Sequence, residues 1–188
     1  SQAWQMGSQR YDALERLSSV NNSLYTKSFG YKTLSGSQST AQVEKIQYSG
    51  LKSALSSLSY SYTYDARGSV ASMTPSVGNR EAYIYDAMGQ LTGAALGNNY
   101  YFYNYDPNGN LMSVQAAGTT NSYTYCNGNW ADLLTAYNGQ AIAYEGQTVA
   151  TDGSVSGSPI SGNPISYYNG TRWNFSWSEG RNLTSARS

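Results

Sequence analysis

Histidine is absent from the 188-residue chain, which removes the side chain that most often serves as a general base or a metal ligand. Charged residues make up only 12% of the sequence, whereas roughly 25% is typical of globular proteins. The 11 basic residues balance the 11 acidic ones and form no cluster, so the sequence predicts no nucleic-acid partner. No apolar run exceeds a few residues, and we therefore expect no membrane insertion.

The chain contains a single cysteine, Cys126, so an internal disulfide is impossible and stability must come from strand pairing and packing. Cys126 is also a poor candidate for a nucleophile, because no histidine is present to activate it. We expect no catalytic residue, no metal site and no cofactor. The chain begins with Ser1 rather than methionine, and we expect it to be a segment of a longer protein. The lack of a signal peptide then says nothing about secretion.

Tyrosine and glycine are abundant instead, with 19 residues each, against 3 phenylalanines and 4 prolines. Tyrosine, serine and threonine suit the pleated surface of a strand, while glycine and asparagine suit tight turns. A tyrosine ring can be buried while its hydroxyl stays within reach of water. This composition predicts broad, thin sheet rather than a compact core.

A nine-residue pattern recurs three times without gaps. It reads Tyr-x-Tyr-Asp-x-x-Gly-x-(Leu/Val), and its copies begin 21 and then 20 residues apart. The copies are Tyr62–Val70, Tyr83–Leu91 and Tyr103–Leu111. A further copy begins after another 20 residues, but Cys126 stands where the aspartate is expected.

We interpret residues 1–188 as a single repeat array rather than as separate domains. The repeats are clear over residues 60–126 and degenerate over 1–59 and 127–188. The Gly-, Ser- and Thr-rich stretch near residues 146–162 is predicted to be a loop or an insertion.

Each repeat has the features of a strand, a tight turn and a return strand. The aspartate is expected to accept hydrogen bonds from the turn, and the glycine to adopt the left-handed conformation that the turn requires. This structural turn motif consists of Asp65, Gly68, Asp86, Gly89, Asp106 and Gly109. The predicted cross-strand pairs are Tyr64–Val70, Tyr62–Ser72, Tyr85–Leu91 and Tyr105–Leu111. The predicted fold is all-β, with tandem hairpins forming one curved antiparallel sheet.

The two tyrosines of each repeat should lie on one face, because side chains along a strand have a period of two. The predicted tyrosine ladder consists of Tyr62, Tyr64, Tyr83, Tyr85, Tyr103, Tyr105, Tyr123 and Tyr125. The opposite face should carry Thr63, Ile84, Asn104 and Thr124. If the sheet curls into a shell, tyrosine suits the inner face, where the hydroxyls would meet trapped water or polar cargo.

The tandem Tyr-x-Tyr-Asp-x-x-Gly-x-Leu pattern resembles the YD repeat of RHS proteins, teneurins and the cocoon-forming subunits of insecticidal toxin complexes. The resemblance covers residues 60–126 well and residues 1–20 and 165–186 loosely. In this family the repeats form a strip of sheet that spirals into a hollow shell. Some shells enclose a C-terminal toxin, and teneurins use theirs in cell adhesion. The self-cleavage core that RHS proteins carry near the toxin junction has no recognisable counterpart here.

The resemblance implies a non-catalytic structural segment of a large shell protein that is secreted or attached to the cell surface. The first partner would be the rest of the parent chain, and further partners would be an encapsulated toxin, a carbohydrate or a cell-surface protein. An alternative function is a binding or adhesion module whose aromatic surface comprises Trp130, Trp173 and Trp177, unless these rings pack on neighbouring hairpins. A glycosidase would need two facing carboxylates, which the sequence does not visibly supply.

Overall fold

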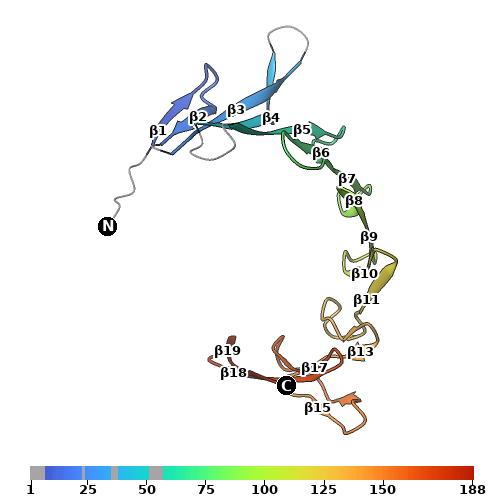
Figure 1. Cartoon of the computed structure of the whole chain (residues 1–188). Helices are drawn as coiled ribbons and strands as arrows, with labels where there is room; N and C mark the ends of the chain where they lie inside the picture. Colours follow the sequence, from blue (N-terminus) through green and yellow to red (C-terminus); the bar gives the residue numbers. More distant parts are fainter. Residues whose placement is uncertain (1–6, 23, 35–37, 51–56) are drawn as a thin grey trace. The chain divides into compact units, whose positions relative to one another are not determined.

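The computed structural model describes residues 7–22, 24–34, 38–50 and 57–188, which form strands and turns and no helix (Figure 1). The predicted all-β class is confirmed. A helix able to cross a membrane is accordingly not found in this part of the chain. The chain divides into two compact units, Ser1–Tyr100 and Tyr101–Ser188.

The first unit is a run of antiparallel strands that pair with their neighbours in chain order (Figure 1). Its strands are β1 (Ser8–Tyr11), β2 (Leu17–Asn21), β3 (Thr26–Thr33), β4 (Ser39–Ser49), β5 (Ser57–Tyr64), β6 (Val70–Pro75), β7 (Glu81–Tyr85) and β8 (Leu91–Leu96). The first two copies of the repeat motif form the hairpins of β5 with β6 and of β7 with β8. In each copy the two tyrosines end the first strand, and the final Val or Leu begins the second. The predicted succession of hairpins is therefore confirmed.

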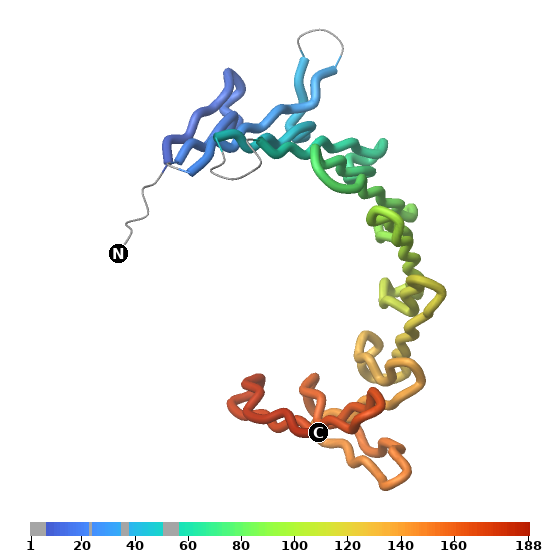
Figure 2. Tube along the Cα trace, viewed as in Figure 1, coloured from blue at the N-terminus to red at the C-terminus, as the bar shows by residue number. Residues whose placement is uncertain are grey.

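The second unit, which runs from yellow-green to red in Figure 2, continues with hairpins, and its strand order then changes. Strands in chain order are β9 (Asn99–Tyr105), which spans the boundary, β10 (Leu111–Ala116), β11 (Thr119–Thr124), β12 (Ala136–Tyr137) and β13 (Gln140–Ala141). A separate four-stranded sheet has the order β14 (Ala143–Tyr144), β17 (Pro164–Tyr168), β18 (Arg172–Ser178) and β19 (Asn182–Arg187). The stretch near residues 146–162 contains a short hairpin of β15 (Thr148–Val149) and β16 (Val155–Ser156).

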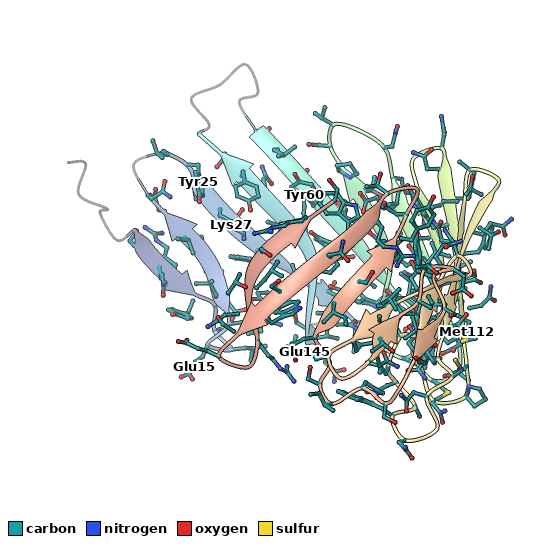
Figure 3. All side chains as sticks on the ribbon, turned by 90° about the horizontal axis from the view of Figure 1, so that it is seen from below. Glu15, Tyr25, Lys27, Tyr60, Met112 and Glu145 are labelled. Atoms are coloured by element: carbon teal, nitrogen blue, oxygen red, sulfur yellow. The ribbon has the colours of Figure 1, made fainter. Side chains whose placement is uncertain are left out.

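A bulge recurs where each return strand begins. The predicted pairs of Tyr64 with Val70, Tyr85 with Leu91 and Tyr105 with Leu111 are confirmed. One residue further on, the register shifts in all three hairpins, and Met112 (labelled in Figure 3) is the residue left unpaired in β10. The predicted pairing of Tyr62 with Ser72 is therefore wrong.

Tyr62 faces Met73, because an extra residue in the return strand displaces every later pair by one position. A register shift also occurs between Arg10 and Tyr11 in the hairpin of β1 and β2. Another occurs between Ser176 and Trp177 in the hairpin of β18 and β19. The bulge is thus part of the repeated unit and extends to its degenerate copies.

Few side chains are fully buried. Among the described residues the buried apolar side chains are Ala94, Leu133, Ala143 and Tyr144. Half-buried aromatic rings contribute further packing. In the first unit, for example, the Lys27 Nζ lies 4.9 Å from the Phe29 ring centroid and 5.5 Å from that of Tyr48 (Lys27 is labelled in Figure 3). Stability must therefore come largely from cross-strand pairs, each of which contributes about 0.2–1 kcal/mol.

Candidate functional site

The turn that begins at Asp65 is closed by its own aspartate. The Asp65 Oδ1 accepts hydrogen bonds from the backbone N–H groups of Arg67 at 2.9 Å and Ser69 at 2.8 Å. The Asp65 N–H donates to the Ser69 carbonyl at 2.9 Å, and the Gly68 N–H donates to the Asp65 carbonyl at 3.1 Å. Gly68 has a φ of +89°, which is in the left-handed region that glycine adopts without steric cost.

The same turn is built at Asp86 and Asp106, where each Oδ1 accepts two backbone N–H groups at 2.9 Å. Gly89 and Gly109 have φ values of +84° and +90°. A further copy lies at Asp12, although Glu15 (labelled in Figure 3) occupies the glycine position with a φ of +60°. The turn geometry therefore tolerates a non-glycine residue in a degenerate repeat.

The turn aspartates are held as hydrogen-bond acceptors. The Asn110 side-chain amide, together with the backbone N–H groups of the turn, holds the pKa of Asp106 below its ordinary value. At Asp12 the pKa is lowered mainly by Arg16, whose guanidinium lies 2.6 Å from the carboxylate. A carboxyl group with a lowered pKa is ionised near neutral pH and has no proton to donate, so this arrangement favours a structural role over acid catalysis.

Tyrosine hydroxyls join successive hairpins. The Tyr64 Oη donates to the carbonyl of Val43 in β4 at 2.6 Å, and the Tyr85 Oη donates to the carbonyl of Val70 in β6 at 3.0 Å. Tyr31 and Tyr144 make equivalent bonds, to the carbonyls of Leu17 at 2.8 Å and Leu134 at 2.6 Å. In the first unit each bond connects a strand to the last strand of the preceding hairpin. We call these contacts the tyrosine tethers.

Two of the ladder hydroxyls have partners within the protein, where trapped water or polar cargo was expected. The hydroxyls of Tyr64 and Tyr85 are used within the sheet. Burial raises the pKa of Tyr64. Tyr83 donates its hydroxyl to the Glu81 carboxylate, and this hydrogen bond, with a smaller contribution from burial, raises the pKa of Tyr83 to about 12.

Exposure alternates along the repeat strands. The ladder tyrosines in both units are half-buried, whereas Thr63, Ile84, Asn104 and Thr124 are exposed. Ile84 is 65% exposed, which marks its face as the more open one in the first unit. Within the second unit, ring contacts continue from Tyr123 to Tyr137 at 5.2 Å between centroids, and from Tyr137 to Tyr167 at 6.1 Å.

The three tryptophans have different environments. Trp173 and Trp177 are half-buried on β18, where Trp173 faces Tyr167 and the Trp177 Nε1 donates to the Pro164 carbonyl at 2.7 Å. Trp130 is 36% exposed and lies between β11 and β12, where it lines a cleft of about 330 Å³. Of the three, Trp130 has the clearest access to a ligand.

Other residues with reactive side chains do not gather into a site. The exposed Cys126 has its Sγ 3.0 Å from the Thr135 Oγ1. In the described part of the chain, no three residues of the types His, Cys, Asp and Glu lie close enough together to hold a metal ion. The tyrosine tethers could not be predicted from the sequence, because the period of a strand does not tell which carbonyl a hydroxyl will reach.

The repeated turn, the bulge and the tethers define a protein built from tandem β-hairpins. Residues 44–147 match the family model of the teneurin YD-shell. The chain belongs to the teneurin YD-shell family. Its role as part of a structural shell follows from this membership. No curated protein matches the sequence.

Solved structures of toxin complexes share the fold. A Photorhabdus luminescens Tc holotoxin pore with a mutated TccC3 matches with a TM-score of 0.54 and 16% identity, over 92% of this chain and 11% of the other. A TcdB2–TccC3 crystal structure matches with a TM-score of 0.55 and 17% identity, over 94% of this chain and 12% of the other. The chain therefore spans only a small part of the length of these relatives.

Proposed function

We propose that this chain is a non-catalytic wall segment of a large YD-shell protein that is secreted or displayed at the cell surface, and that the shell encloses a toxin cargo. The observation that carries the proposal is the set of tyrosine tethers. They use tyrosine hydroxyls, including those of the ladder residues Tyr64 and Tyr85, to connect hairpins, as a continuous wall requires. The family membership supports the shell, and the toxin-complex relatives support the cargo.

We base the proposed absence of catalysis on the turn aspartates. The aspartates that recur at equal spacing are acceptors for turn amides, and their carboxylates are already engaged. Hydrolysis of a glycan or peptide by the pure chain, abolished by replacing a single carboxylate, would contradict this part of the proposal.

The wall role can be tested by protease protection of the cargo in the parent protein. Gly89→Val together with Gly68→Val should strain two turns, because both glycines have positive φ. The cargo should then be digested faster than in the unchanged parent. Ile84→Ser, at an exposed position of β7 between the two turns, serves as the control and should preserve protection. Equal digestion of the cargo in all three proteins would contradict a wall role.

We also propose that the tyrosine face is the inner face of the shell. The half-buried ladder and the exposed positions between its tyrosines support this orientation. In a parent protein with Cys126 replaced by serine, a cysteine at Thr63 should react with a bulky maleimide. A cysteine at Tyr62 should react slowly until the shell is opened. The reverse pattern of labelling would show that the face is assigned wrongly.

A binding or adhesion module is the second candidate function, and the exposure of Trp130 at a cleft favours it. Trp173 contributes less to such a surface, since it faces Tyr167 across two paired strands. Trp177 donates its Nε1–H to the Pro164 carbonyl, so Trp130 is the one tryptophan that we propose as a ligand contact. Loss of ligand binding on Trp130→Ala, but not on Trp173→Ala, is the expected result.

A further inference from the structure

A cleft without charged residues lies between two segments of the second unit that are outside the three clear repeats. Asn127, Asn129 and Trp130 form one wall, and residues 157–160 form the other. Its volume of about 330 Å³ is within the range of small-molecule pockets. All residues that line it are neutral, and several of them carry amide or hydroxyl groups.

The wall that carries Trp130 is fixed by a local turn. The Asn127 Oδ1 accepts the backbone N–H groups of Asn129 and Trp130, each at 3.0 Å. The Leu133 N–H donates to the Trp130 carbonyl at 3.1 Å. Gly162 lies against the ring so closely that a Cβ there would be 3.3 Å from the Trp130 Cη2. The indole is therefore held in position while 36% of the residue stays exposed.

The opposite wall is anchored through Glu145, which Figure 3 labels. The Ile160 N–H donates to the Glu145 carbonyl at 2.8 Å. The Glu145 carboxylate accepts hydrogen bonds from the Ser161 hydroxyl and, at 2.9 Å, from the Asn163 side-chain amide. The Gln147 Nε2 donates to the Gly157 carbonyl at 3.1 Å. A wall fixed at several points is preorganised, so binding costs little conformational entropy.

We propose that this cleft binds a neutral pyranose sugar, with a C–H face of the sugar on the Trp130 ring and its hydroxyls on Asn127, Asn129 and Ser158. An aromatic ring offers a flat apolar surface to the C–H groups. Amide and hydroxyl side chains both donate and accept, as the hydroxyls of a sugar do. The neutral lining disfavours an ionic ligand, whose charge would lose water without gaining a partner.

A second cleft in the same unit provides an internal control. It has a volume of about 460 Å³ and is lined by Tyr168, Asp152 and Arg172, among others. Tyr168 is 37% exposed, nearly the same fraction as Trp130. The Arg172 guanidinium, however, lies 5.9 Å from the Tyr168 ring centroid, and the lining is charged. This cleft tests whether any exposed aromatic ring would bind a sugar equally well.

The experiment titrates the 188-residue chain with methyl glucoside, methyl galactoside and N-acetylglucosamine, and separately with glucuronate. Binding is followed in NMR spectra through the Trp130 indole N–H signal in the unchanged chain, and through the backbone amide signals of Asn129 and Ser158 in every variant. At least one neutral sugar should saturate and shift the Trp130 signal, and it should bind more tightly than glucuronate does. Trp130→Ala should weaken binding by about tenfold or more, which is at least 1.4 kcal/mol. Trp130→Phe should weaken it less, and Tyr168→Ala should leave it unchanged.

The absence of saturable binding by all three neutral sugars would overturn the proposal, as would equal or tighter binding of glucuronate. Unchanged binding in Trp130→Ala, or loss of binding in Tyr168→Ala, would do the same. If Trp130→Ala does not fold, Trp130→Phe and Asn129→Ala decide the question. The inference deepens the second candidate function alone. Its failure would leave the shell role standing, because protease protection in the parent protein tests that role separately.

Discussion

Replacing Tyr64 by phenylalanine isolates one tyrosine tether. The substitution keeps the half-buried ring and removes only the hydroxyl, which donates to the Val43 carbonyl at 2.6 Å across 21 residues of sequence. A hydrogen bond of this kind contributes about 0.5–1.5 kcal/mol net, and a partly buried carbonyl that loses its donor raises the cost. We therefore expect Tyr64→Phe to lower the free energy of unfolding by about 1 kcal/mol.

Two measurements together test this value. Urea unfolding gives the change in free energy, and hydrogen exchange of the β4 and β5 amides reports whether the loss is local, because repeat arrays can open in parts. Tyr100→Phe is the matched control, since Tyr100 is 61% exposed and its loss of a hydroxyl should change stability by less than about 0.5 kcal/mol. If Tyr64→Phe costs no more than Tyr100→Phe, the tethers do not join the hairpins energetically.

Three further substitutions test the turns and the ladder. Gly89→Val should lower the free energy of unfolding in urea by about 1–2 kcal/mol, because the φ of Gly89 is +84°. A Cβ at Gly89 would meet nothing within 4 Å, so the cost would come from the backbone and not from a clash. Gly128→Val, also in open space but without a positive φ, should cost less. Asp106 stabilises the fold at pH values above its ordinary pKa of 3.8, and this contribution is lost as the pH falls through the lowered pKa of the folded state. In Asp106→Asn, the free energy of unfolding should therefore decrease less steeply at acid pH. Glu81→Gln should lower the pKa of Tyr83 from about 12 towards 10, as an NMR titration of the ring would show.

The raised pKa of Tyr83 also determines how stability changes at alkaline pH. The pKa of Tyr83 is raised in the folded chain, so its contribution is complete below pH 10 and is lost as the pH rises through about 12. A steeper alkaline loss in Glu81→Gln than in the unchanged chain would contradict the assignment. Equal costs for the two glycine variants would likewise show that backbone strain at the turn is unimportant.

Sequence reasoning was most successful where a residue type has one local use. The aspartate and the glycine three positions later define where a turn opens and closes, so the pairing of Tyr64 with Val70 could be predicted. The bulge one residue later could not, because it depends on backbone geometry rather than on residue type. That is why Tyr62 was assigned to Ser72 instead of Met73.

The candidate sites were harder to predict for a different reason. The tethers and the Trp130 cleft both depend on contacts between residues far apart in the sequence, such as Tyr64 with Val43. The segment around Trp130 has no repeat from which a register could be extended. Residues 157–160 are held opposite this segment by the hydrogen bonds of Glu145. No periodic pattern in the sequence predicts these bonds.

The most direct test of the account is the deletion of one whole repeat. Removing residues 83–102 joins Ala82 to Tyr103 and preserves the spacing of the motif, because the two copies begin 20 residues apart. If each hairpin interacts mainly with its neighbours, the shortened chain should retain a β-sheet circular dichroism spectrum and cooperative unfolding. Removing only residues 83–92 breaks the repeat and should unfold the region. Equal loss of structure in both deletions would contradict a modular array of hairpins.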